Sequence, residues 1–165
     1  MFDRILVPLD GSRVGEAAIP VIRQLVDKLA PTVQVEITLL AVIAILRHWV
    51  VVGEASAPVS YTEEEMGLIK QRVMDYLEQT AKTIRKEGVT VNTMVSTGNA
   101  GDEILKAADE IKADLIAMST HGRSGIRRLA FGSITDRVIR STNIPVLIVR
   151  APEGITNEPQ PGHYV

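Results

Sequence analysis

Short apolar runs alternate with amphipathic helical patterns through most of this chain, and this alternation constrains its fold more than any other feature. Runs that predict strands lie at residues 5–9, 35–43, 89–95, 115–118 and 145–149. Apolar residues at helical spacing fall between them, at residues 17–29, 66–84, 104–111 and 134–141. Strands that alternate with helices form right-handed βαβ crossovers and a parallel sheet. We therefore expect an α/β, Rossmann-like fold, with a five-stranded parallel sheet and helices on both faces.

Several residues predict where the helices begin and end. Ser12 is suited to cap the first helix, and Pro20 is expected to kink it. Thr62 is followed three residues later by Glu65, a capping-box pattern at the start of the second helix. Gly88 suits the C-terminal stop of that helix.

Residues 44–61 show little periodicity and contain two breakers, Gly53 and Pro58. We expect a long loop here, with at most a short helical turn. His48 and Trp49 within it are expected to form a lid or contact surface rather than a ligand site.

The composition is that of an ordinary globular domain. The chain has 165 residues, 45% of them hydrophobic and 23% charged, enough for one domain with a sizeable core. The net charge of -2 argues against a general nucleic-acid binder, and the absence of cysteine excludes disulfides and thiolate zinc sites. The first strand follows almost at once, without a basic and apolar leader, so we expect no secretory signal. No apolar run reaches the roughly 20 residues that span a bilayer. We expect a cytoplasmic protein with no membrane partner, a domain over residues 1–150, and a disordered tail over residues 151–165.

A glycine-rich loop follows the run at residues 115–118. It reads Ser119-Thr120-His121-Gly122-Arg123-Ser124-Gly125 and continues to Phe131-Gly132-Ser133, where the last helical pattern begins. Glycine lets the backbone approach a ligand closely, and the unpaired amides at a helix start point toward negative charge. The loop therefore predicts a phosphate site, in which Ser133 would also cap the helix.

A second candidate, Asp10, directly follows the first strand. Ligands of parallel sheets bind beyond the carboxyl ends of strands, at the switch point of the topology. If the strands at 5–9 and 115–118 are neighbours, Asp10 and the glycine-rich loop face one crevice. Asp10 then either contacts the ligand or only accepts hydrogen bonds from its own turn.

The polar residues near the loop form no known catalytic motif. Arg123, Arg127 and Arg128 are either a solvated cluster or a screen for a triphosphate, and His121 is expected to hydrogen-bond its own turn. The chain has no Gly-x4-Gly-Lys-Ser/Thr loop, no His-Glu-x-x-His and no Gly-x-Ser-x-Gly elbow. We expect a binding protein rather than an enzyme, with weak hydrolysis of a phosphate ligand at most.

Both ends of the chain resemble the universal stress protein family. Residues 4–12, Arg-Ile-Leu-Val-Pro-Leu-Asp-Gly-Ser, are similar to its first strand and turn, and residues 119–133 and 143–149 are similar to its C-terminal third. The resemblance covers residues 1–150 by the order of elements and is weak between residues 44 and 84. It implies the fold already expected, with ATP, ADP or AMP as the ligand, with or without Mg²⁺.

The nucleotide-binding members of that family carry Gly, two residues, Gly, nine residues, Gly, then Ser or Thr. Gly122, residues 123–131, Gly132 and Ser133 match the second part, whereas Ser119 stands in place of the first glycine. If that place needs a positive φ, a serine costs on the order of 1 kcal/mol. If it needs only a small side chain, serine fits and can add a hydrogen bond.

The resemblance also implies a division of roles. It assigns the phosphates to Gly122, Gly132, Ser133 and the Ile134 amide, and the adenosine end to Pro8, Asp10 and the backbone near Val42, with Ser119 near the ribose. The carboxylate of Asp10 suits a ribose hydroxyl or an adenine amino group, because it would repel a phosphate unless Mg²⁺ bridged them. The full set expected to bind the nucleotide is Pro8, Leu9, Asp10, Val42, Met118, Ser119, Gly122, Arg123, Gly125, Gly132, Ser133 and Ile134.

The leading hypothesis is therefore an adenine-nucleotide-binding stress regulator or sensor. Its rivals are an interaction protein that binds no nucleotide and an ATP-using enzyme of nucleotide-transferase or pyrophosphatase architecture. A flavodoxin-like FMN carrier is disfavoured because aromatic residues are scarce. The apolar last strand, Val146 to Val149, predicts an association edge. The resemblance implies that it pairs across a two-fold axis, so we expect a homodimer.

Overall fold

The computed structural model describes residues 2–28, 33–44, 48–52, 55–59, 61–120, 132–152 and 154–155. The elements in chain order are β1 (Arg4–Leu9), a 3-10 turn η1 (Gly15–Ala17), α1 (Ala18–Asp27), β2 (Val35–Ile43), β3 (His48–Val52), β4 (Ala55–Val59), α2 (Glu63–Lys82), β5 (Val89–Thr97), α3 (Ala100–Glu110), β6 (Leu115–Thr120), α4 (Ser133–Ser141) and β7 (Val146–Arg150). No helix of the described part is long and apolar enough to cross a membrane.

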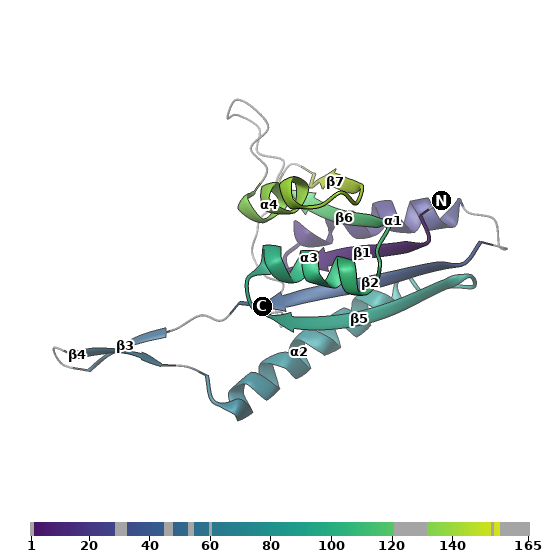
Figure 1. Cartoon of the computed structure of the whole chain (residues 1–165). Helices are drawn as coiled ribbons and strands as arrows, with labels where there is room; N and C mark the ends of the chain where they lie inside the picture. Colours follow the sequence, from purple (N-terminus) through teal and green to yellow (C-terminus); the bar gives the residue numbers. More distant parts are fainter. Residues whose placement is uncertain are drawn as a thin grey trace.

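The main sheet has five parallel strands in the order β5-β2-β1-β6-β7 (Figure 1). This confirms the predicted fold. The chain adds β2 and then β5 on one side of β1, and returns to add β6 and β7 on the other. Strands β1 and β6 are neighbours, with Leu6 paired to Ile116. The switch point of the topology therefore lies between the strands that precede Asp10 and the glycine-rich loop.

Two apolar layers hold the helices against the sheet. Side chains of β1 alternate between them, because successive residues of a strand point to opposite faces. Ile5 and Val7 pack with α1 and α2, whereas Leu6 packs with α3 and α4. Figure 1 shows the same division, with α3 and α4 on one face of the sheet and α1 and α2 on the other. Burial of these side chains supplies the main driving force for the fold.

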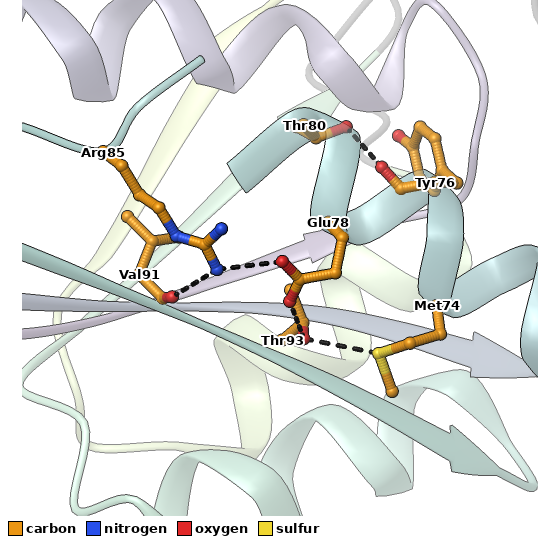
Figure 2. A network of polar contacts seen from close by, with 7 residues as sticks. All are labelled: Met74, Tyr76, Glu78, Thr80, Arg85, Val91 and Thr93. Carbon is orange, nitrogen blue, oxygen red and sulfur yellow. Dashed lines mark hydrogen bonds and ion pairs between the residues drawn. The ribbon is translucent and has the colours of Figure 1, made fainter. Parts of the chain in front are cut away.

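A polar network also ties α2 to the outer strand β5 (Figure 2). The hydroxyl of Thr93 donates to Glu78 Oε1 at 2.8 Å and lies 3.3 Å from the sulfur of Met74. Arg85 donates to Glu78 Oε2 at 2.9 Å and to the carbonyl of Val91 at 3.2 Å. The hydrogen bonds from Thr93 and Arg85 lower the pKa of the Glu78 carboxyl. Glu78 thus joins the body of α2 to the edge of the sheet.

The prediction of a long loop over residues 44–61 was wrong in part, because this segment contains the two paired strands β3 and β4. Strands β3 and β4 pair antiparallel with each other, in a sheet separate from the main one. The β-branched run Val50–Val52 favours a strand, and Pro58 is tolerated because each strand of a two-stranded sheet has an open edge. The side chains of His48 and Trp49 lie outside the described residues, so their role as a lid or contact surface stays a prediction.

Two predicted helix boundaries are confirmed, the start of α2 and the end of α4 at Ser141, whereas the end of α2 and the cap of α1 were wrong. The capping box of Thr62 and Glu65 is confirmed, with both hydrogen bonds formed. However, α2 ends at Lys82, and Gly88, with φ +79°, serves the turn into β5 instead. Pro20 is the third residue of α1, in its first turn, where its missing N–H removes no hydrogen bond within α1. The Ser12 hydroxyl accepts the Gly15 amide at 3.0 Å, ahead of η1, and does not cap α1, whose N-cap residue is Ala17.

Strand β6 runs longer than predicted, and β7 lies one residue later than predicted. β6 extends to Thr120, so that Ser119 belongs to the strand rather than to the loop. After β7, the Ala151 amide donates to the carbonyl of Thr120 at 2.9 Å. Residues 156–165 lie outside the described residues, and their predicted disorder stays a prediction.

Candidate functional site

A cavity of about 380 Å³ opens at the carboxyl ends of β1 and β6. It brings together most of the predicted site residues: Pro8, Leu9, Asp10, Val42, Met118, Ser119, Gly132, Ser133 and Ile134. Gly122, Arg123 and Gly125 lie outside the described residues, as do His121, Arg127 and Arg128. Two segments far apart in sequence, the ends of β1 and β6, therefore share one cavity with the start of α4.

Sequence reasoning missed other residues of the cavity wall, namely Val14, Gly15, Leu40, Ala100, Ile104, Thr120 and Thr135. Leu40 comes from β2, the other neighbour of β1, so strand order alone could have found it. Ala100 and Ile104 come from α3, whose start lies at the same edge of the sheet. The Asn99-x-x-Asp102 pattern could have located the start of α3, because Asn99 caps the helix by accepting the Asp102 amide.

The start of α4 is not capped by any side chain of the described residues. Gly132 is the N-cap residue, and the first backbone bond runs from the Asp136 amide to the Gly132 carbonyl at 2.9 Å. The amides of Ser133, Ile134 and Thr135 donate to no described residue. The prediction that Ser133 caps the helix was wrong, because Ser133 is already its first helical residue. The cavity wall thus includes a helix start with unused donors.

The position of α4 is fixed against α3. Arg137 on α4 pairs with Asp102 on α3, through Nε at 2.9 Å and through a second guanidinium nitrogen. Gly101 makes room for this pair, since a Cβ there would lie 2.5 Å from Arg137 Cδ. The two helix starts that border the cavity, Ala100 and Ser133, are therefore held by one ion pair and one close contact.

Asp10 is both a turn residue and a cavity residue. Its Oδ1 accepts the Ser12 amide at 3.0 Å and the Ser12 hydroxyl at 2.7 Å. The turn needs Gly11, whose φ of +73° is left-handed. Both hydrogen bonds that the described residues give Asp10 fall on Oδ1, which leaves Oδ2 for another partner. The two alternatives weighed for Asp10 are therefore compatible.

Ser119 adopts an ordinary strand conformation. Lys112 is the one described non-glycine residue with a positive φ, so the strain considered for a serine at position 119 does not arise. Its hydroxyl accepts the Ala18 amide at 2.9 Å and donates to the Gly15 carbonyl at 2.7 Å. Ser119 therefore binds β6 to the chain segment that begins α1.

The cavity wall combines apolar and polar side chains. Leu9, Val42 and Met118 supply apolar surface, and Asp10 is the one formally charged residue among the described lining residues. No cluster of three or more His, Asp or Glu side chains suited to a metal ion occurs among the described residues. The described wall is thus suited to a ligand with an apolar ring, a hydrogen-bonding end and an anionic end.

A second cavity, of about 330 Å³, lies between α1 and α2 and contains none of the predicted residues. Tyr76 and Glu16 border it. Burial, followed by the nearby carboxylates of Glu16 and Asp10, raises the pKa of Tyr76. Tyr76 therefore remains a neutral hydroxyl and offers no base. This cavity carries no chemistry comparable to that of the first.

Comparison with known proteins decides the family. The model of the universal stress protein family matches residues 1–150. The chain belongs to the universal stress protein family. Universal stress protein MJ0531 of Methanocaldococcus jannaschii is 27% identical over 157 residues, covering 93% of this chain and 85% of that protein. Universal stress protein YxiE of Bacillus subtilis is 29% identical and covers 91% of this chain and 100% of that protein.

Solved structures share the fold. The structure of MJ0577 has a TM-score of 0.69 at 24% identity and covers 93% of this chain and 99% of that chain. A universal stress protein in complex with cAMP has a TM-score of 0.58 at 19% identity, covering 90% and 97%. A family protein from Arabidopsis thaliana with AMP bound has a TM-score of 0.59 at 15% identity, covering 92% and 93%. At these identities the likeness establishes the fold alone.

Proposed function

We propose that this universal stress protein binds an adenine nucleotide in the cavity between β1 and β6 and acts as a stress-response regulator or sensor. The observation that carries the proposal is the start of α4, which no described side chain caps, in the same cavity as the Asp10 carboxylate. Helix starts carry partial positive charge and free amides, which favour phosphate. A carboxylate at the other end favours the hydroxyl or amino donors of a nucleoside.

The described residues fit such a ligand. A volume of about 380 Å³ lies in the lower part of the range of ligand pockets, roughly 300–1,000 Å³. We assign the phosphates to the amides of Ser133 and Ile134, and the adenosine end to Oδ2 of Asp10 and the wall near Pro8 and Val42. Gly122, Arg123 and Gly125 would complete the phosphate side. Two family members of known structure bind cAMP and AMP, which supports adenine as the base.

Mg²⁺, if it accompanies ATP, would be held mainly by the phosphates. The described residues offer one carboxylate in the cavity, Asp10, and no cluster of metal ligands. When bound, the ion would neutralise phosphate charge. The contribution of the chain is to bind and orient the nucleotide, through amides at one end and a carboxylate at the other.

We place regulation above catalysis. Asp10 is the one carboxylate on the described wall, and one of its two oxygens, Oδ1, already accepts two hydrogen bonds from Ser12. If Asp10 binds the adenosine end, the described wall has no other carboxylate that could activate water, so we expect nucleotide hydrolysis to be slow. We further propose a cytoplasmic homodimer formed through β7, which lies at the edge of the sheet with partly buried apolar residues on both faces.

The test is the small molecule that the protein carries. The purified protein is denatured, the released molecules are identified by mass spectrometry, and ATP, ADP and AMP are then titrated with and without Mg²⁺. Bound adenine nucleotide, or saturable binding, supports the proposal. Absence of both a ligand and a thermal shift at millimolar nucleotide contradicts it and favours the nucleotide-independent interaction protein. Multiple rapid turnovers would favour an enzyme.

A further inference from the structure

A continuous series of hydrogen bonds runs from the end of β6 to the end of β1. The hydroxyl of Ser119 donates to the Gly15 carbonyl at 2.7 Å, and the Gly15 amide donates to the Ser12 hydroxyl at 3.0 Å. The Ser12 hydroxyl donates in turn to Asp10 Oδ1 at 2.7 Å. The Ser12 hydroxyl joins the last two bonds directly. The first two meet at the backbone of Gly15, so all three form together only while Gly15 keeps its position.

Gly15 is the central link of this series. A Cβ at this position would lie 2.1 Å from Asp10 Oδ1, so the Gly15 backbone lies directly against the carboxylate. Its carbonyl is held by Ser119 and its amide by Ser12. A shift of this residue therefore moves the surface on which the Asp10 side chain rests.

Ser119 also holds the other side of the same segment. The N-cap residue of α1, Ala17, makes no side-chain cap. The Ala18 amide donates to the Ser119 hydroxyl at 2.9 Å, and the carbonyl of Glu16 is its backbone partner. A strand residue 101 positions away in sequence thus serves as the cap of this helix. With both of these bonds made, Ser119 fixes Gly15 and Ala18 at once.

We infer that Ser119 is a positioning residue: acting through Gly15 and Ser12, it fixes the Asp10 carboxylate for the adenosine end of the ligand. The part of this inference that concerns the ligand rests on the proposed function. The competing explanation is that Ser119 only caps α1. The two explanations differ at Gly15 and Ser12, whose amides do not bind Ser119.

Hydrogen exchange, measured by NMR without any ligand, separates them. In Ser119→Ala we expect exchange about tenfold faster at the Ala18 amide and several-fold faster at Gly15 and Ser12, because three linked bonds lose their anchor. Ser119→Thr retains the hydroxyl and should restore all three amides. Thr62→Ala, which removes the cap of α2, is the control for a general loss of stability and should leave them unchanged.

A second variant keeps the test decisive if Ser119→Ala folds poorly. Ser12→Ala breaks the same series nearer to Asp10, and should speed exchange at Gly15 and Ser12 while sparing Ala18. If Ser119→Ala changes the Ala18 amide alone, or if Ser12→Ala leaves the Gly15 and Ser12 amides unchanged, the inference is overturned and Ser119 is only a helix cap.

Ligand titration tests the consequence for binding. Ser119→Ala should lower the affinity for adenosine about tenfold, because a displaced Asp10 carboxylate would lose one hydrogen bond with the ligand. The affinity for inorganic tripolyphosphate should change less than about twofold. An equal loss for both ligands contradicts a role through Asp10. If the unaltered protein binds no adenine compound, the proposed function fails, and the exchange measurements still decide the role of Ser119.

Discussion

Helices α2 and α4 begin in opposite ways. At α2, Thr62 and Glu65 form both bonds of a capping box, and three glutamates occupy the first turn. At α4, Gly132 offers no side chain, and the amides of the first turn have no acceptor among the described residues. The first start is complete by itself, whereas the second is left open at the wall of a cavity.

The difference shows how a fold can reserve a site. A capped helix start uses its amides for stability, typically about 1 kcal/mol. An uncapped start forgoes that stability and keeps the amides for an anion. Helix α3 shows that a start at this sheet edge can be capped, since Asn99 caps it there. The open start of α4 is therefore a local property of Gly132 and not of the sheet edge.

The largest effect is expected from closing the open start. Gly132→Asp places a carboxylate on the α4 amides, where a Cβ meets no atom within 4 Å. We expect ATP affinity to fall on the order of 100-fold, because the new carboxylate would accept the α4 amides and repel the phosphates. The free energy of unfolding should rise by about 0.5 kcal/mol. Calorimetric titration and thermal unfolding measure both. Gly132→Asn caps without charge and should lose less affinity. Undiminished binding by the aspartate variant would contradict the account.

The next effect comes from removing one amide while keeping the helix. Ser133→Pro deletes the N–H at the first helical position, where proline is tolerated, and Gly132 already has the extended ψ of 155° that precedes proline. We expect about a tenfold loss of ATP affinity with little change in stability. Ser133→Ala is the matched control, since it removes the hydroxyl and keeps the amide. Equal affinities for the two variants would show that the amide does not bind phosphate.

The capped start should respond in the reverse manner. Thr62→Ala removes the acceptor of the Glu65 amide, so the free energy of unfolding should fall by about 1 kcal/mol. Affinity for ATP should not change, because this start does not border the cavity. Chemical denaturation and the same titration would detect either departure, and a loss of binding would mean that the two helix starts are not independent.

The smallest effect concerns the body of α2 and its pH dependence. The pKa of Glu78 is lowered by hydrogen bonds from Thr93 and Arg85. Its contribution to stability is therefore present above its ordinary pKa of 4.5 and is lost as the pH falls through the lowered value in the folded state. Glu78→Gln should reduce the loss of stability on acidification, measured by urea unfolding between pH 7 and pH 3. If the variant lost as much stability between pH 7 and pH 3 as the unaltered protein, Glu78 would not contribute to the pH dependence.

The sheet could be predicted because its signals are local. Apolar runs bounded by turns located every strand of the main sheet, and their alternation with helices required parallel pairing. The hairpin was missed because Gly53 and Pro58 mark turns and strand edges as readily as loops. The end of α2 was predicted too late because a glycine with a left-handed conformation, such as Gly88, can serve a turn as well as a helix end.

The cavity was largely predictable, whereas its bonding was not. Asp10 stood out because it directly follows the first strand, and Gly132 because it ends the glycine-rich loop just before the last helical pattern. The hydrogen bonds of Ser119 to Gly15 and Ala18 join residues about 100 positions apart, as do those of Asp114 to Asp3 and Arg4. Such bonds depend on how the folded strands are placed, and no spacing along the chain reveals them.

The central claim is that the open start of α4 binds the charged end of a nucleotide, and amide NMR during an ATP titration tests it most directly. The account predicts saturable shifts at Ser133 and Ile134, with the amides of Glu63, Glu64 and Glu65 at the capped start of α2 unmoved. Saturating ATP that leaves the Ser133 and Ile134 amides unshifted would contradict it.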